Sequence, residues 1–498
     1  MQSMFSRATL FRTKRPDADL TRPSGLLPVL TAWDLTLLGI GCIIGTGIFV
    51  LTGIAAAEQA GPAVVLSFVV SGFACAFAAL AYAELSSSVG GCGSAYGYSY
   101  AAFGEFMAWI IGWDLVLEYG VSVAAVANGW SGYFNTGLAG LTQKLHDWYG
   151  LNIDLTLPMQ LTRGPFAHDP VTHLATPGIV NLPAVAIILI LMGILIVGIK
   201  QSARLNTVMV IVKLSTIAIF LAVSVGHIQP SLWTPFMPFG WFDTLPDGKT
   251  VGVLAGASVV FFAYVGFDAV STAVEEAKNP SRDVPIGILS SLVFCTIIYI
   301  IVSGVLTGIV PYSSLNVKEG SPVAYALQQI GFNGASILVS TGVIFGLTTV
   351  MLVLYYGLTR IIFAMSRDGL LPATLGEVNE KTHTPVRTTV ICGVVMAVMA
   401  GFIPLGTLAE LVNIGTLVAF VLVCIGVIVL RRRYPDMKRP FEAPFGILIP
   451  ILGVLSCGAL VFFLPFLTQL RFVLWLLVGL VIYFAYSVHH SKLRADTK

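Results

Sequence analysis

The chain has 498 residues, of which 56% are hydrophobic and only 10% are charged, and its formal net charge is +2. Its mean hydropathy is +0.88. Soluble domains carry about 25% charged residues, so this composition excludes a soluble globular enzyme, a disordered chain and a collagen-like fibre. The apolar excess instead predicts an all-α integral membrane protein, since a spanning helix uses about 20 apolar residues.

Twelve apolar segments follow one another along the chain, and we expect each to cross the membrane as a helix. A polar and basic stretch, residues 1–31, precedes them and lacks the cleavage site of a secretory signal. Residues 90–104, rich in Gly, Ser and Tyr, predict a short re-entrant or interfacial element. The twelve segments are 32–56, 62–87, 107–136, 178–199, 204–226, 251–276, 284–309, 334–366, 386–403, 408–430, 444–466 and 470–488.

Segments 1 and 6 are both interrupted, in segment 1 by Gly39, Gly41, Gly45 and Gly47 and in segment 6 within residues 261–268. Breaks at matching places five segments apart indicate an inverted repeat, because an odd number of crossings turns the second copy over. The predicted repeats are residues 32–226 and residues 251–430. Two further segments, 444–488, and a short tail, 489–498, follow the second repeat.

Positive charge predicts the orientation of these segments. With the N-terminus inside, 21 of the 27 Lys and Arg residues lie on or near the inner side, five lie outside, and Lys213 lies within the membrane. Positive charge resists translocation, so we expect both termini in the cytoplasm of a cell whose cytoplasmic membrane holds the protein.

The break in segment 1 predicts an anion site. Unwound backbone in a membrane needs partners for its polar groups, which otherwise cost several kcal/mol each. The N–H groups of Gly45, Thr46 and Gly47 would face a substrate carboxylate at the positive end of a half-helix. The glycines alone are also compatible with close helix packing, so this prediction depends on the second break.

The break in segment 6 predicts a cation site. The carbonyl groups of Phe262, Ala263 and Val265 would face a substrate ammonium. Together the two breaks suit an α-amino acid, which carries both charges.

Lys213 is the most informative single residue of the sequence. It lies nine residues after Arg204, or about 13 Å along a helix, which places it near the middle of the bilayer. Its side chain either snorkels to an interface or stays buried, and burial favours the neutral amine. A buried lysine that exchanges its proton would couple proton movement to transport.

Segment 3 carries a second candidate for substrate contact. Asp114, Glu118 and Ser122 are spaced by four and share one helix face. Glu118 is deep enough to meet the substrate ammonium or side chain, or to serve as a structural hydrogen-bond acceptor. Asp268, directly after the segment 6 break, is expected to cap the second half-helix.

Four stretches resemble the amino acid–polyamine–organocation superfamily, and within it the bacterial homologues of cationic amino acid transporters. They are Gly39–Phe49, Phe261–Thr272, Glu275–Pro285 and Ala364–Pro372, and the resemblance runs from about residue 30 to about residue 485. It implies a LeuT-like fold: a 5+5 inverted repeat plus two helices, with helices 1 and 6 discontinuous and a central site reached by alternating access.

The resemblance also implies roles for individual residues. The Thr46 and Gly47 amides would bind the carboxylate, and the Ile43 carbonyl would join those of segment 6 around the ammonium. Met351 would bound the side-chain end of the pocket. Proton-coupled relatives carry a lysine at the position of Lys213, which favours protons over sodium.

The expected function is therefore proton-coupled symport of neutral, small to medium L-amino acids, with cationic ones as possible substrates. An exchanger of cationic amino acids or amines is the alternative, and a channel or sensor a more distant one. The sequence contains no catalytic motif, metal-ligand set or nucleotide loop, so neither an enzyme nor a cofactor is expected. The expected partners are the amino acid and membrane lipid, without nucleic acid, and the sequence identifies no accessory subunit.

Overall fold

The computed structural model describes residues 12–13, 29–89, 95–167, 178–197, 203–246, 248–315, 320–382 and 384–492. Most of the predicted N-terminal segment 1–31, the first five residues of the stretch 90–104 and the end of the tail 489–498 lie outside the described residues. Residues 95–102 of that stretch form a short buried helix, α6.

The described chain is almost entirely helical, and a helix occurs in each of the twelve predicted segments. The elements of the first half are α3 (Ala32–Ile43), η1 (Gly47–Leu51), α4 (Thr52–Ala55), η2 (Ala56–Ala60), η3 (Gly61–Ala63), α5 (Val64–Val89), α6 (Ala95–Ala102), α7 (Glu105–Tyr149), η4 (Met159–Leu161), α8 (Leu182–Val197), α9 (Ala203–Ser224), η5 (Val225–His227) and η6 (Pro230–Trp233).

The second half begins with a two-stranded antiparallel hairpin in which Asp243 pairs with Val251 and Thr244 with Thr250. Its elements are β1 (Asp243–Thr244), β2 (Thr250–Val251), α10 (Val253–Val260), η7 (Phe261–Tyr264), η8 (Phe267–Glu276), α11 (Pro280–Ile309), η9 (Tyr312–Ser314), α12 (Pro322–Gln329), α13 (Asn333–Arg367), η10 (Ala373–Leu375), α14 (Val386–Phe402), α15 (Leu405–Arg433), α16 (Leu448–Phe463), α17 (Phe466–Ile482), η11 (Tyr483–Ser487) and α18 (Val488–His490).

Eight helical runs of the described chain are long and apolar enough to cross a membrane. Four shorter apolar helices accompany them: α3, α8, α14 and α16. The protein is thus a multi-pass membrane protein, in agreement with the composition.

Both predicted interruptions are present. α3 ends at Ile43, Ile44 is extended, and helical turns resume at Gly47. In segment 6, η7 ends at Tyr264, and the chain passes through Gly266 at φ 112° before η8 begins. That φ lies in the left-handed region, where only glycine is unstrained. The turns that follow are not regular α-helix, because η1 is a π-helix and η8 a 3₁₀-helix of 10 residues.

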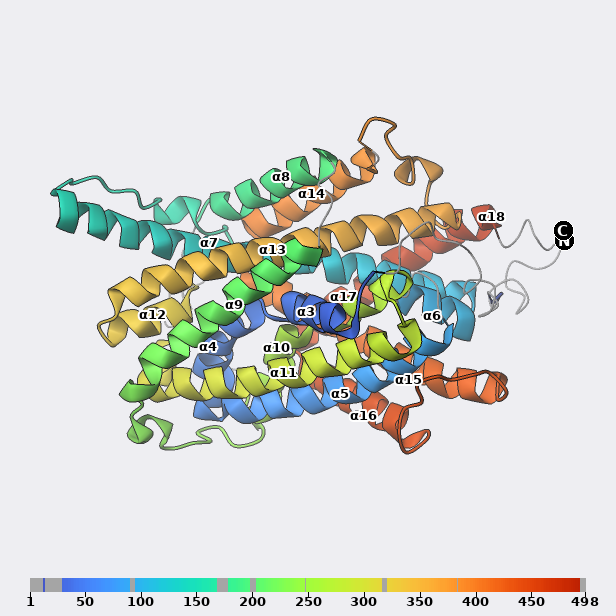
Figure 1. The fold of residues 1–498 in the computed structure, drawn as a ribbon, viewed down its shortest axis with the longest axis horizontal. Coiled ribbons are helices and arrows are strands. Elements are labelled where there is room, and N and C mark those ends of the chain that lie inside the picture. Colours follow the sequence, from blue (N-terminus) through green and yellow to red (C-terminus); the bar gives the residue numbers. More distant parts are fainter. Residues whose placement is uncertain are drawn as a thin grey trace.

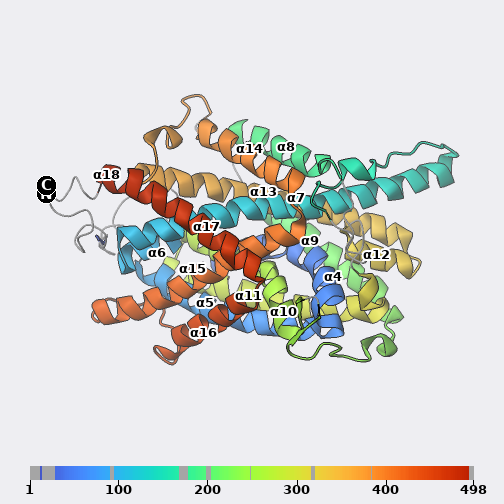
Figure 2. The same cartoon turned by 180° about the vertical axis from the view of Figure 1, so that it is seen from behind.

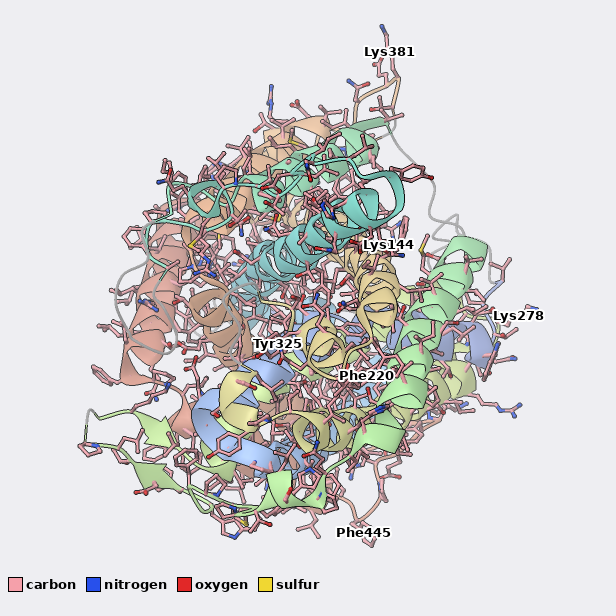
Figure 3. The ribbon with its side chains drawn as sticks, turned by 90° about the vertical axis from the view of Figure 1, so that its left-hand side faces the viewer. Lys144, Phe220, Lys278, Tyr325, Lys381 and Phe445 are labelled. Atoms are coloured by element: carbon pink, nitrogen blue, oxygen red, sulfur yellow. The ribbon has the colours of Figure 1, made fainter. Side chains whose placement is uncertain are left out.

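The helices pack as a bundle whose long axis is horizontal in Figures 1 and 2. α7 packs against α13 and α15, α5 against α11, and α8 against α14. The short helix α6 lies at one end of the bundle, and the short helix α12 lies at the opposite end (Figure 1). Seen along the bundle, Lys278, Lys381 and Phe445 lie at its rim (Figure 3).

Candidate functional site

The two broken helices meet at the centre of the bundle, where η1 contacts η7. Gly47 marks the closest approach. A Cβ atom at Gly47 would collide with the backbone and Cβ of Ala263. Glycine is therefore needed here for close approach, and the same approach puts the backbone of both breaks around one space.

That space is a small cavity bounded by both breaks and by two continuous helices, α7 and α13. Its volume is about 20 Å³, enough for about one water molecule. Its walls must therefore separate before an amino acid can enter. The lining residues are Cys42, Ile43, Gly45, Thr46, Gly47, Ser122, Val126, Phe262, Val265, Val350 and Leu354.

All three residues predicted to bind a carboxylate line this cavity. The N–H groups of Gly45 and Thr46 donate to no backbone carbonyl in the described part of the chain. Gly47 begins η1, so its N–H has no partner within that helix. The hydroxyls of Thr46 and Ser122 are also buried there without a hydrogen-bond partner. The cavity wall therefore presents up to five donors, a set that suits an anionic oxygen.

The residues predicted to bind the ammonium are divided between the cavity and its surroundings. Ile43, Phe262 and Val265 line the cavity, whereas Ala263 lies beside it. The carbonyl oxygens of Ile43 and Ala263 both accept a hydrogen bond from the Tyr299 hydroxyl, each at 2.8 Å. Tyr299, on α11, thus bridges the two broken helices.

Lys213 is buried, with 1% of its surface exposed, and its Nζ donates to the Gly41 carbonyl at 2.5 Å. Snorkelling to an interface is thereby excluded in this structure. Gly41 lies in the last turn of α3, where helix carbonyls lack intrahelical partners and carry partial negative charge. The stem of Lys213 packs over Gly346 of α13, so the side chain joins three helices next to the break.

Glu118 is buried one turn before Ser122, but it is not among the described residues that line the cavity. It belongs to a separate buried group with Asp114 and Asp268. Both carboxylate oxygens of Asp114 and one of Asp268 have no hydrogen-bond partner. Asp268 lies in the first turn of η8, and the N-cap position expected for it is occupied by Gly266.

On α13 the cavity is lined by Val350 and Leu354, which are four residues apart and share one face. Met351 is buried on the same helix outside that lining. With Val126 of α7, these side chains form the apolar part of the cavity lining, beside the Ser122 hydroxyl of the same helix.

Comparison with known proteins identifies close relatives of this chain. The family described as amino acid permease matches residues 30–486. The methylthioribose transporter of Bacillus subtilis is 47% identical over 98% of this chain and 99% of its own length. The branched-chain amino acid permease BcaP of the same organism is also 47% identical, over the same shares of both chains. The vacuolar cationic amino acid transporter 4 of Arabidopsis thaliana is 38% identical over 83% of this chain and 65% of its own length.

Proposed function

The chain belongs to the amino acid permease family, which makes it a membrane transporter and not an enzyme, and we propose that it is a proton-coupled symporter of neutral L-amino acids. The observation that carries the proposal is the group of unpaired donors at Gly45, Thr46 and Gly47 on a cavity that aliphatic side chains of α7 and α13 also line. A carboxylate satisfies the donors, and an aliphatic side chain matches the apolar part of the lining.

The apolar part of the lining and one relative favour branched-chain substrates. Val126, Val350 and Leu354 offer no charge or hydrogen bond to a substrate side chain. A guanidinium or ammonium among them would be costly without a partner. The relative named as a branched-chain permease, from Bacillus subtilis, agrees with this preference.

Alternating access within a 5+5 inverted repeat is supported by the packing. Under this proposal α5 corresponds to α11, α7 to α13 and α8 to α14, and each of these pairs is in contact. The short helix α6 precedes α7 as α12 precedes α13, at opposite ends of the bundle (Figure 1). Inverted repeats have this property, because equivalent connections lie on opposite membrane faces.

Lys213 is proposed as the proton carrier. When it is charged, its ammonium ties α9 to the end of α3; when it is neutral, that attachment weakens and the first half of segment 1 is freer to move. Loss and gain of one proton would thus bias the movement that opens the cavity. The charge distribution supports an orientation with both termini in the cytoplasm, and an inward proton gradient would drive import into the cell.

A second candidate is methylthioribose transport, because a relative with that name is as similar as the branched-chain permease. This sugar thioether carries neither a carboxylate nor an ammonium, so it would leave the donors of segment 1 without an ionic partner. Exchange of cationic amino acids is a third candidate, since a relative named for them is 38% identical.

Uptake into proteoliposomes distinguishes these candidates. Under an inward proton gradient we expect leucine to accumulate, with valine and isoleucine as competitors and little competition by arginine or methylthioribose. Accumulation of methylthioribose instead of leucine would overturn the amino acid proposal. Arginine uptake that requires an amino acid inside the proteoliposomes and does not depend on the proton gradient would favour the exchanger.

The same assay tests the proton carrier. Lys213→Met keeps an apolar stem over Gly346 but removes the amine, so gradient-driven leucine accumulation should fall at least tenfold while leucine exchange continues. Lys381→Met is the matched control, because Lys381 is exposed at the rim of the bundle (Figure 3). Equal accumulation by wild type and Lys213→Met would refute the assignment.

A further inference from the structure

A groove of about 230 Å³ lies between the first turns of α11 and the loop that joins α15 to α16. Its lining changes along α11: Ser281 and Arg282 are polar, and Ile286 and Leu289 further along are apolar. Arg282 and Leu289 are about 10 Å apart along the helix. Phe441 forms the facing wall, so the groove has one charged end and one apolar end.

The charged end carries basic groups without partners. Arg282 is exposed, and its guanidinium makes no ion pair or hydrogen bond within the described part of the chain. Lys278, on the turn before α11, is also exposed and lies at the rim in Figure 3. Lys438 precedes the facing wall by a few residues and is exposed as well. The electrostatic potential at this end is therefore positive.

Two acids close to the groove already have partners within the protein. Asp283 is buried and accepts the backbone N–H of Asn279, so it is turned into the protein. The Oε1 atom of Glu442 lies 3.6 Å from Nη1 of Arg431, and Arg431 also forms an ion pair with Glu84. Asp283 and Glu442 are thus already engaged by the chain itself, whereas Asp436, two residues before Lys438, is exposed.

The position of the groove relative to the membrane identifies its occupant. α11 is one of the candidate spans, so its first turn lies at the membrane boundary and its later turns lie in hydrocarbon. We propose that the groove binds an anionic phospholipid, with its phosphate at Arg282 and an acyl chain along Ile286 and Leu289. Free phosphate would leave the apolar end empty, and a zwitterionic headgroup would bring a second positive charge to a basic site.

Such a lipid would join two parts of the molecule. One wall belongs to α11, which follows the broken segment 6 directly. The other wall is held to α5, because Glu84 accepts from the Arg431 guanidinium at 2.6 Å and from the Ala443 N–H at 2.9 Å. A lipid that contacts both walls stabilises their arrangement, and binding to the folded protein alone raises its melting temperature.

The test compares the melting temperature of the purified protein in mixed micelles that contain phosphatidylglycerol or phosphatidylcholine at the same mole fraction. We expect phosphatidylglycerol to give the larger increase. Arg282→Gln should lose at least half of that difference, and Ile286→Ser should reduce it through the acyl chain. Arg387→Gln is the matched control, since Arg387 is an exposed arginine at the start of α14 and does not line the groove.

Three results would overturn the proposal. Equal stabilisation of the wild type by both lipids removes the requirement for an anionic headgroup. If Arg282→Gln and Arg387→Gln lose the same share of the difference in melting temperature between the two lipids, the lipid responds to general surface charge and not to this groove. Stabilisation by inorganic phosphate at the same concentration, unaffected by Ile286→Ser, indicates a phosphate site without a lipid.

Discussion

Gly47 illustrates how one residue governs the approach of the two broken helices. An added methyl group would meet the Ala263 backbone, which cannot move aside as a flexible side chain does. Gly47→Ala should therefore separate the breaks, with an overpacking cost of about 1–3 kcal/mol, and abolish transport. We would measure the melting temperature and leucine exchange of the purified variant.

Gly97→Ala provides the control for this substitution. Gly97 lies within α6 and has open space where its Cβ would be, so alanine should leave transport unchanged and slightly stabilise the helix. Normal exchange by Gly47→Ala would mean that the breaks do not need this contact.

Tyr299 supplies the hydroxyl that connects Ile43 and Ala263. Tyr299→Phe keeps the ring, which packs against Phe68 and Tyr264, but leaves the two buried carbonyls without that donor. We expect a loss of about 1–3 kcal/mol of stability and a lower transport rate, because the relative position of the breaks is less defined. A melting curve unchanged from wild type would show that water replaces the hydroxyl without cost.

The sequence predicted the break residues better than their surroundings. Glycine spacing located Gly45–Gly47, and the second break followed from Phe261–Asp268, because both are local features of the chain. Tyr299 and the contact of Lys213 with Gly41 depend on helices far apart in sequence. A single tyrosine within an apolar helix has no spacing pattern to distinguish it, and no signal in the sequence pointed to it.

At the scale of elements, two tryptophans of α7 contact α17: Trp109 donates to the Gly479 carbonyl at 2.9 Å, and Trp113 stacks on Trp475. The indoles of Trp113 and Trp475 stack with centroids 4.3 Å apart, and each donates to the other's backbone carbonyl, at 2.9 and 3.2 Å. Trp475→Leu should cost about 2 kcal/mol by the loss of stacking and one hydrogen bond. Trp33→Leu, at a 69% exposed position of α3, is the control for loss of an indole.

The expected result is a lower melting temperature for Trp475→Leu with leucine exchange per folded molecule preserved, since α17 lies outside the proposed repeats. A large loss of exchange at an unchanged melting temperature would instead assign α17 a part in the transport cycle.

Element positions were predicted more accurately than element ends. The third segment was expected at 107–136, but α7 has 45 residues and continues to Tyr149. The end of an apolar run marks the edge of the hydrocarbon layer and not the end of a helix. This helix continues to its C-cap, Gly150, whose φ of 62° lies in the left-handed region. The π and 3₁₀ turns after the breaks were likewise not predictable, because apolar periodicity does not resolve one helix type from another.

At the scale of the whole molecule, the charge asymmetry predicts which end of the bundle faces the cytoplasm. In a background whose seven native cysteines are all replaced, single cysteines at Asp154, Lys381 and Lys438 report on three connections, all at exposed positions. Asp154 follows α7, whereas Lys381 precedes α14 and Lys438 follows α15. An odd number of crossings separates Asp154 from the other two if every segment spans the membrane.

We therefore expect a membrane-impermeant maleimide to label Asp154→Cys on intact cells, and to label Lys381→Cys and Lys438→Cys only after permeabilisation. The physical reason is that the arginine-rich end of α15 and its loop resist translocation. Labelling of Lys381→Cys but not Asp154→Cys on intact cells would reverse the proposed orientation. Labelling of all three would mean that a short helix such as α8 does not cross, which the inverted repeat cannot accommodate.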